Sequence, residues 1–293
     1  MAKTNPRKQI KEGAKILKEI MRDQLKPISD DMVKRTMAKA RGATAAQLPN
    51  VVKDIEPKGV NDYKKILTEL FGALAADAIN QARKEVPKAK NVKLSEWEKL
   101  PAELKRKLKL NIDLLADNQM ESLKKALSFS YLHNYDTTDS MDLLNQDLID
   151  GMDEYLDGPS ISAGAEISSS TIISTARDTF FDDPEVGGNI EAFQFINGDP
   201  VTPICTDLDG TVFAKDDPDR FRYTPPLHWN CKSYIAPILV GNLGNREIEK
   251  LKPSSKKIEE TIQFDEALKA AIDNVSFMKL DPDQTLKKKK KKN

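Results

Sequence analysis

The sequence predicts an α+β protein that is mainly α: a helical N-terminal region, a small mixed domain with short strands around a Cys/His loop, and a C-terminal helix. Three observations favour this class. Apolar residues recur at helical spacing through residues 1–158, the composition shifts towards Ser, Thr, Gly and Ile after Gly158, and both cysteines fall within residues 199–237. We therefore divide the chain into a partner-binding helical region (1–158), a small domain (159–240) and a C-terminal helix with a lysine-rich tail (241–293).

The first part of the chain predicts three amphipathic helices. Residues 9–25 have apolar side chains at helical spacing and should end before Pro27, because proline breaks a helix interior. Residues 28–46, rich in Ala and Lys, predict a second helix, and the apolar stripe from Tyr63 to Ala78 predicts a third that ends at Pro87. These stripes either pack on one another as a core or lie in grooves of partner proteins.

Residues 95–158 predict further helices. A short helix before Pro101 is followed by two helical stretches, one through Leu104 to Leu115 and one through Met120 to Tyr131. His133 follows the second stretch, where it suits a cap or turn rather than a ligand. Asp139 or Ser140 should cap a last helix, which Gly158-Pro159 ends.

The small domain is expected to begin with a linker from Ser160, followed by a helix through Phe181. Short strands are predicted at residues 193–196, 211–213 and 234–240, with Asp209-Gly210 as a turn that joins the first two. After Pro253 the spacing predicts one more amphipathic helix, which would serve as a packing or partner-binding arm.

The composition excludes several classes. The 46 basic and 46 acidic residues balance, which argues against a protein that coats nucleic acid. No stretch approaches 18 uninterrupted apolar residues, so we expect no membrane span, and the polar N-terminus lacks an apolar signal core, which implies cytoplasmic synthesis. The chain ends in a run of six lysines that is either a solvated tail or a non-specific DNA contact: Lys287, Lys288, Lys289, Lys290, Lys291 and Lys292.

Cys205, His228 and Cys231 are the strongest candidate ligands in the sequence. Thiolate and imidazole are groups that zinc prefers, and His228-x-x-Cys231 has a spacing common in structural zinc sites. Structural zinc usually takes four ligands, so Asp207 or a water would have to complete the set. The alternatives are a metal-free loop with two buried free cysteines and a hydrogen-bonded histidine, or a disulfide, which a reducing cytoplasm disfavours.

The same loop carries a resemblance to a family. The segments 202–213 (TPICTDLDGTVF) and 225–233 (PPLHWNCKS) match, in order and spacing, the motif of the Mu-F-like head morphogenesis family, the minor head proteins of tailed phages. The segment 176–179 (ARDT) resembles a shorter family motif upstream. The chain departs from the pattern at Thr202 and Ser233, where the family often has cysteine.

The resemblance implies a structural role rather than catalysis. A protein of this family would act in head morphogenesis at the portal vertex, would meet the portal protein and the major capsid or scaffolding protein, and would contact phage DNA non-specifically. It would be made in the bacterial host cytoplasm, would end in the virion head, and would have no membrane partner. A zinc clip would suit the small domain, whose core is thin.

Three other functions stay open at this point. Asp207 and Asp209 fit a phosphatase motif of the haloacid-dehalogenase type, but Pro200 and Pro203 spoil the strand that this motif must follow. A zinc ion with three protein ligands and an open position, or a Cys231–His228 pair, would fit an enzyme. A zinc-dependent or DNA-binding accessory protein would combine the zinc-like spacing with the lysine run.

Overall fold

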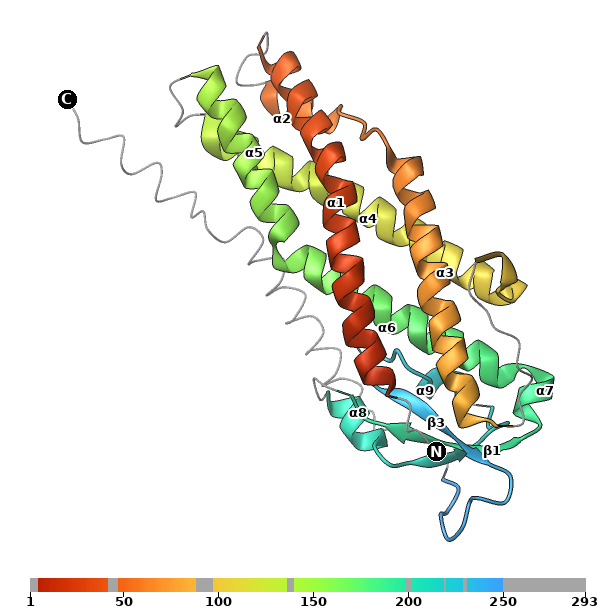
Figure 1. The fold of residues 1–293 in the computed structure, drawn as a ribbon. Helices are drawn as coiled ribbons and strands as arrows, with labels where there is room; N and C mark the ends of the chain where they lie inside the picture. Colours follow the sequence, from red (N-terminus) through yellow and green to blue (C-terminus); the bar gives the residue numbers. More distant parts are fainter. Residues whose placement is uncertain are drawn as a thin grey trace. The chain divides into compact units, whose positions relative to one another are not determined.

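The computed structural model describes residues 5–41, 47–87, 97–135, 140–198, 202–218, 220–228 and 231–249 (Figure 1). These residues form two compact units. Unit 1 contains the described residues of 1–17, 66–112 and 165–249, and unit 2 contains those of 18–65 and 113–164. Most described residues are helical and one small sheet is present, which confirms the α+β, mainly α, class.

The helices of the first half are longer and fewer than the sequence suggests. They are α1 (Pro6–Ala40), α2 (Leu48–Lys53), α3 (Val60–Glu85), the short 3₁₀ helix η2 (Trp97–Lys99) and α4 (Ala102–Tyr135). The two predicted stretches around Leu108 and Leu123 are therefore one helix, α4, and both leucines are fully buried.

The prediction that a helix ends before Pro27 is wrong, because Pro27 lies inside α1. A proline removes the hydrogen bond to the carbonyl four residues earlier. Here Asp23 and Pro27 both face solvent, so water can satisfy the freed carbonyl. On the opposite face Leu25, Ile28 and Met32 continue the buried stripe, and their burial keeps the helix intact.

Unit 2 is held by a helical core with polar contacts at its edge. Tyr63 is buried and its hydroxyl hydrogen-bonds to the side chain of Gln119. Lys64 pairs with Asp113 at 3.1 Å and with Asp117 at 2.9 Å. Helix α5 (Met141–Asp157) begins as the sequence predicts, because the Ser140 hydroxyl accepts a hydrogen bond from the backbone N–H of Leu143 at 3.2 Å.

The linker predicted from Ser160 is wrong, because helix α6 (Pro159–Asp182) begins one residue after Gly158. Its small residues serve close packing rather than a loop. The buried Ser169 hydroxyl donates to the carbonyl of Ile10 at 2.8 Å, and the buried Ser170 hydroxyl donates to the carbonyl of Cys231. Serine is a poor helix former, but each of these contacts satisfies a buried hydroxyl and brings a backbone close to α6.

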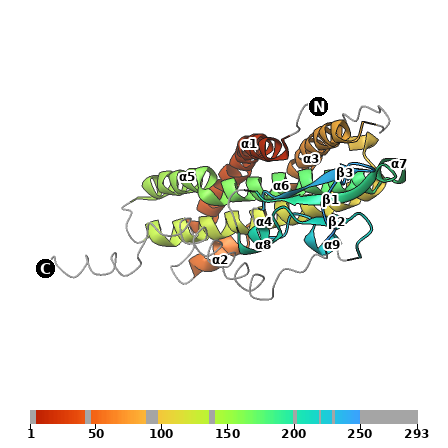
Figure 2. The same cartoon turned by 90° about the horizontal axis from the view of Figure 1, so that it is seen from below.

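The rest of unit 1 holds a three-stranded antiparallel sheet with short helices around it. The order is α7 (Pro184–Gly187), β1 (Ile190–Ile196), α8 (Pro203–Leu208), β2 (Val212–Ala214), α9 (Arg220–Tyr223) and β3 (Tyr234–Leu239). Figure 2 shows β1 between β2 and β3, and Phe193 of β1 pairs with Phe213 of β2 and Pro237 of β3. The three strands agree with those predicted.

The Asp209-Gly210 turn exists, but it does not join two strands as predicted. Gly210 has φ +81°, which glycine adopts without strain, and the turn leads from α8 into β2. Pro203 stands at the start of α8, where its missing N–H costs nothing, so the segment before the turn is helical rather than extended.

Some expectations fall outside the described residues. These are the helix predicted after Pro253 and the run Lys287 to Lys292. The division of the chain at residues 158 and 240 stays a prediction. Among the helices described, none is both long and apolar enough to cross a bilayer.

Candidate metal centre

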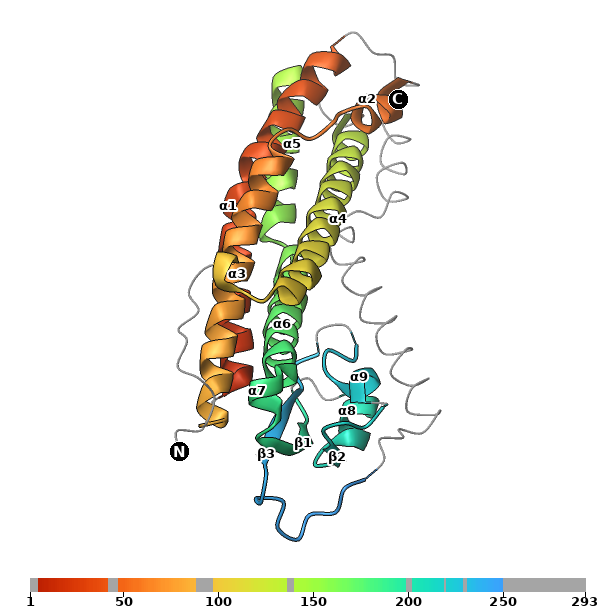
Figure 3. The ribbon, with the colours of Figure 1, turned by 90° about the vertical axis from the view of Figure 1, so that its right-hand side faces the viewer.

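Cys205, His228 and Cys231 come together in unit 1, as the sequence motif suggests. Cys205 Sγ lies 3.3 Å from His228 Nε2 and 3.9 Å from Cys231 Sγ, and the three ligand atoms all lie within 4.8 Å of one another. Both cysteines are fully buried and free, and His228 is half-buried. Figure 3 shows the short helices α8 and α9 beside β1 and β2, in the part of unit 1 that supplies these residues.

The separations suit a tetrahedral ion. With ordinary zinc bond lengths, two sulfur ligands lie about 3.8 Å apart, and a sulfur and a nitrogen lie about 3.6 Å apart. The two measured separations from Cys205 are close to these values, so metal binding would need only a small movement of His228 relative to Cys231. The residues present therefore fit zinc, and they fit a reduced thiol pair as well.

The electrostatics favour one thiolate and one thiol. The pKa of Cys231 is lowered well below its usual value, because the Cys205 thiol donates a hydrogen bond to it and the His228 ring lies beside it, against the opposing effect of burial. The pKa of Cys205 is raised, first by that same hydrogen bond and then by burial. A metal ion would replace the remaining proton, since thiolates are the metal-binding form.

Two hydroxyls stand at the positions where the Mu-F-like motif often has cysteine. Thr202 is fully buried, and Ser233 is 1% exposed. Both hydroxyls lie beside the Cys205 sulfur and favour its ionised form, Ser233 more strongly than Thr202. Of these five motif positions, only Cys205, His228 and Cys231 carry good zinc ligands.

Backbone contacts hold the loop in place. The N–H of Cys231 donates to the carbonyl of His228 at 3.3 Å. The N–H of Gly198 donates to Ser233 Oγ at 3.0 Å. Lys232 pairs with Glu166 of α6 at 2.9 Å. These contacts tie the end of β1, residues 231–233 and α6 together.

Two arginines that the sequence analysis did not single out for a role support this region. Arg177 of α6 is 2% exposed and forms a bidentate ion pair with Glu85, with N–O distances of 2.7 and 2.9 Å. Its guanidinium also donates a hydrogen bond to the carbonyl of Ile235 in β3. Arg220 of α9 pairs with Asp178 and Asp182 of α6 and lies 4.5 Å from the Phe193 ring centroid. The short match at residues 176–179 contains Arg177 but not Arg220.

Asp207, Asp209 and His133 are not part of the cluster. Asp207 is exposed on α8, and Asp209 is exposed and accepts a hydrogen bond from the N–H of Asn197 at 2.8 Å. Asp207 lies within helix α8 rather than at the end of a buried strand, so the arrangement that a phosphatase motif needs is not found among the described residues. His133 lies in the last turn of α4, stacked on Phe129 with ring centroids 6.5 Å apart.

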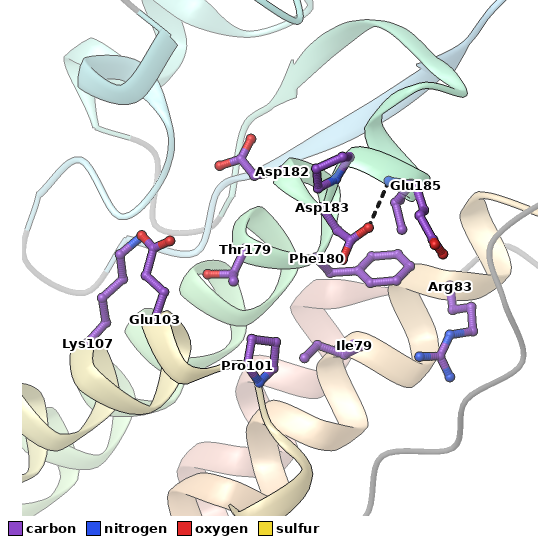
Figure 4. A pocket seen from close by; sticks show the side chains of 12 residues that line it. Ile79, Arg83, Pro101, Glu103, Lys107, Thr179, Phe180, Asp182, Asp183 and Glu185 are labelled. Atoms are coloured by element: carbon purple, nitrogen blue, oxygen red, sulfur yellow. Dashed lines mark hydrogen bonds and ion pairs between the residues drawn. The ribbon is translucent and has the colours of Figure 1, made fainter.

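Unit 1 also contains a cavity of about 380 Å³ between α3, α4 and α6 (Figure 4). Its charged side chains are already engaged. Glu103 pairs with Lys107 at 3.0 Å, Asp182 pairs with Arg220 at 2.7 Å, and Asp183 accepts from the N–H of Glu185 at 2.9 Å. Because these charged groups already have partners, we assign the cavity no reacting role.

Comparisons of the chain with protein-family models, with curated proteins and with solved structures found no match.

Proposed function

We propose that this protein is a minor head protein of a tailed phage, which acts in head morphogenesis at the portal vertex, and that Cys205, His228 and Cys231 bind zinc as a structural clip. The observation that carries the proposal is the convergence of the motif's two halves, 25 or so residues apart, on one buried cluster. This closure supports the metal-binding part of the proposal, and the sequence resemblance supports the head role.

The clip would have a clear structural task. Cys205 lies on α8, whereas His228 and Cys231 precede β3 in the chain. Zinc bound by all three would link these segments and stabilise the short elements around the sheet. The Ser170 hydroxyl donates to the carbonyl of Cys231 beside the cluster, and we assign the cluster a structural rather than a reacting role.

The partners proposed are the portal protein and the major capsid or scaffolding protein, met through the helical region. DNA contact is a second element of the proposal and rests on the terminal lysines alone. If the tail binds DNA phosphates, deletion of Lys287 to Lys292 should reduce the slope of log affinity against log salt by about five. An unchanged slope would remove DNA from the proposal.

The test of the head assignment is incorporation into particles. The chain is co-expressed with the portal and major capsid genes from its own genomic neighbourhood, and particles are separated by sedimentation and analysed by mass spectrometry. Incorporation in few copies supports the assignment, and absence from all portal-containing particles refutes it.

A surface variant sharpens this test. Leu143 on α5 is 56% exposed, so Leu143→Asp should leave folding intact while removing apolar surface. Gln146→Asp, an exposed site on the same helix, adds a similar charge and serves as the matched control. Loss of incorporation in the first variant alone would locate a partner contact on α5.

A further inference from the structure

Cys205 and Cys231 are near enough to each other to be joined by a disulfide bond. Their Sγ atoms lie 3.9 Å apart, and both thiols are free and fully buried. The two sulfurs of a disulfide lie about 2.05 Å apart, so these sulfurs would have to approach by about 2 Å. A change of side-chain rotamer moves a sulfur atom over distances of this size. The measured separation therefore suits a reduced pair that oxidation can join.

The pair has no competitor within the chain. The sequence contains two cysteines, so only one intrachain disulfide can form. Cys205 belongs to α8, and Cys231 lies 26 residues later, before β3. A disulfide would thus link the same two segments that a metal ion bound by Cys205, His228 and Cys231 would link.

A metal ion and a disulfide exclude each other at this site. Thiolate is the form of cysteine that binds metal, and a disulfide contains no thiolate. After oxidation, His228 would be the one ligand left in the cluster. A structural zinc site usually takes four ligands, so a single imidazole would not retain the ion.

Burial limits which oxidants can reach the pair. Neither cysteine exposes any surface, so a bulky reagent meets the sulfurs only when the surrounding segments open. Hydrogen peroxide is small, and it is the oxidant that we consider. The same burial would shield the finished disulfide from reductants.

We propose that Cys205 and Cys231 form a redox-switched clip: the reduced pair binds metal together with His228, and the oxidised pair is a disulfide that keeps the two segments linked without metal. This inference rests on the proposed function, since it adds regulation to the proposed metal site. It also gives the switch an occasion, because a phage head is assembled in a reducing cytoplasm and is later released into an oxidising medium.

The oxidation proceeds in two balanced steps. One thiol attacks a peroxide oxygen, so that an S–O bond forms, the O–O bond breaks and a water molecule leaves. The second thiol attacks the sulfur of the resulting sulfenic acid, so that the S–S bond forms, the S–O bond breaks and a second water leaves. The two thiols lose two protons and two electrons in all, and one peroxide molecule is reduced to two molecules of water.

The experiment uses the purified full chain, stripped of metal under reducing conditions and then treated with hydrogen peroxide. We expect both thiols to disappear, the chain to stay monomeric, and a non-reducing digest to contain peptides joined through Cys205 and Cys231. Because the bond closes a loop, the melting temperature should rise by roughly 5–10 °C over that of the reduced, metal-free chain. Co²⁺, whose visible absorption reports thiolate ligands, should bind to the reduced chain and not to the oxidised one.

Cys231→Ala is the matched control, because it leaves one thiol and every methionine in place. Peroxide should not raise the melting temperature of this variant, and an equal rise would overturn the proposal by assigning the effect to other oxidation. Cys205→Ala serves in the same way, should the first variant fail to fold. The unaltered chain loaded with Zn²⁺ should lose its thiols more slowly than the metal-free chain, because the ion would occupy both sulfurs.

The outcomes distinguish this inference from the proposed function. Absence of Co²⁺ binding by the reduced chain would refute the metal site and the switch together, while leaving the particle test of the head assignment unaffected. Co²⁺ binding by the reduced chain, with no peptides joined through Cys205 and Cys231 after oxidation, would overturn the switch alone. Disulfide-linked dimers in place of the intrachain bond, or Co²⁺ binding that survives oxidation, would overturn it as well.

Discussion

Gly198→Ala should disrupt the cluster more than any other single methyl addition near it. Gly198 is buried and follows β1 in the chain. It lies against the backbone of Lys232 and Ser233, next to Cys231. A Cβ at this position would lie 2.1 Å from the carbonyl carbon of Lys232, 2.3 Å from its oxygen and 2.4 Å from the N of Ser233. All three are backbone atoms, so no side-chain rotation can relieve the overlap.

The size of the effect follows from those distances. Non-bonded carbon atoms prefer about 3.5–4.0 Å, so one of the two backbones would have to move by more than about 1 Å. Overpacking of this kind costs about 1–3 kcal/mol, and the same movement would break the Gly198–Ser233 hydrogen bond, worth about 1 kcal/mol. We expect a loss of about 2–4 kcal/mol in the free energy of unfolding and weaker Co²⁺ binding.

The assay is urea unfolding followed by circular dichroism, with Co²⁺ titration in parallel. Gly188→Ala is the matched control, because Gly188 has an ordinary φ of −60° and the nearest atom to its added Cβ is the Pro184 oxygen at 3.4 Å. That change should alter stability by no more than about 0.5 kcal/mol. Equal unfolding midpoints for the two variants would refute the close approach of Gly198 to the backbone of Lys232 and Ser233.

Three further predictions concern other parts of the fold. Glu85→Gln leaves the charge of buried Arg177 without its partner and should cost roughly 3 kcal/mol in urea unfolding, more than Arg177→Met, because Glu85 is 16% exposed and Arg177 only 2%. Equal costs would contradict this ordering. Ser140→Ala removes the N-cap of α5 and should cost about 1 kcal/mol in thermal unfolding, whereas Ser140→Asp should cost almost nothing. Lowering the pH should release Co²⁺ from the cluster, because protons compete for the thiolates and the imidazole; affinity that is flat between neutral and mildly acid pH would argue against these ligands.

The local elements of this fold were largely predictable, since they follow from spacing. Buried stripes such as Leu104, Leu108 and Ile112 identify a helix without any knowledge of its neighbours. The Ser140 cap of α5 and the strand β3, which ends at Leu239, were predicted in the same way. Each depends on residues close together in the chain.

The secondary-structure predictions were wrong where contacts between residues distant in the sequence determine the local structure. Pro27 and the serines of α6 are local signals against a helix, and burial against other elements overrides both. The insertion of α8 between β1 and β2 was missed for a similar reason, because the pairing of Phe193 with Phe213 depends on the sheet and not on the turn.

The candidate site was predictable in its ligands but not in its surroundings. The three candidate ligands stand out because cysteine and histidine are rare in this chain. The roles of Arg177 and Arg220 could not be read from spacing, since their partners lie far away in the sequence, 92 residues in the case of Arg177 and Glu85. Charged residues are common in this sequence, so none of these positions is conspicuous by composition.

Helix α6 positions the segment of the chain that carries Cys231. Glu166, Ser170 and Arg177 contact Lys232, Cys231 and Ile235 in turn, so one helix sets the position of the whole segment that carries the second cysteine. Each residue of an α-helix turns by about 100°, so one inserted residue in the middle of α6 would rotate Arg177 away from β3 while Ser170 stayed in place. Insertions should therefore be rare within α6 in related chains and common after β3, where Gly241 and Gly244 lie in open turns.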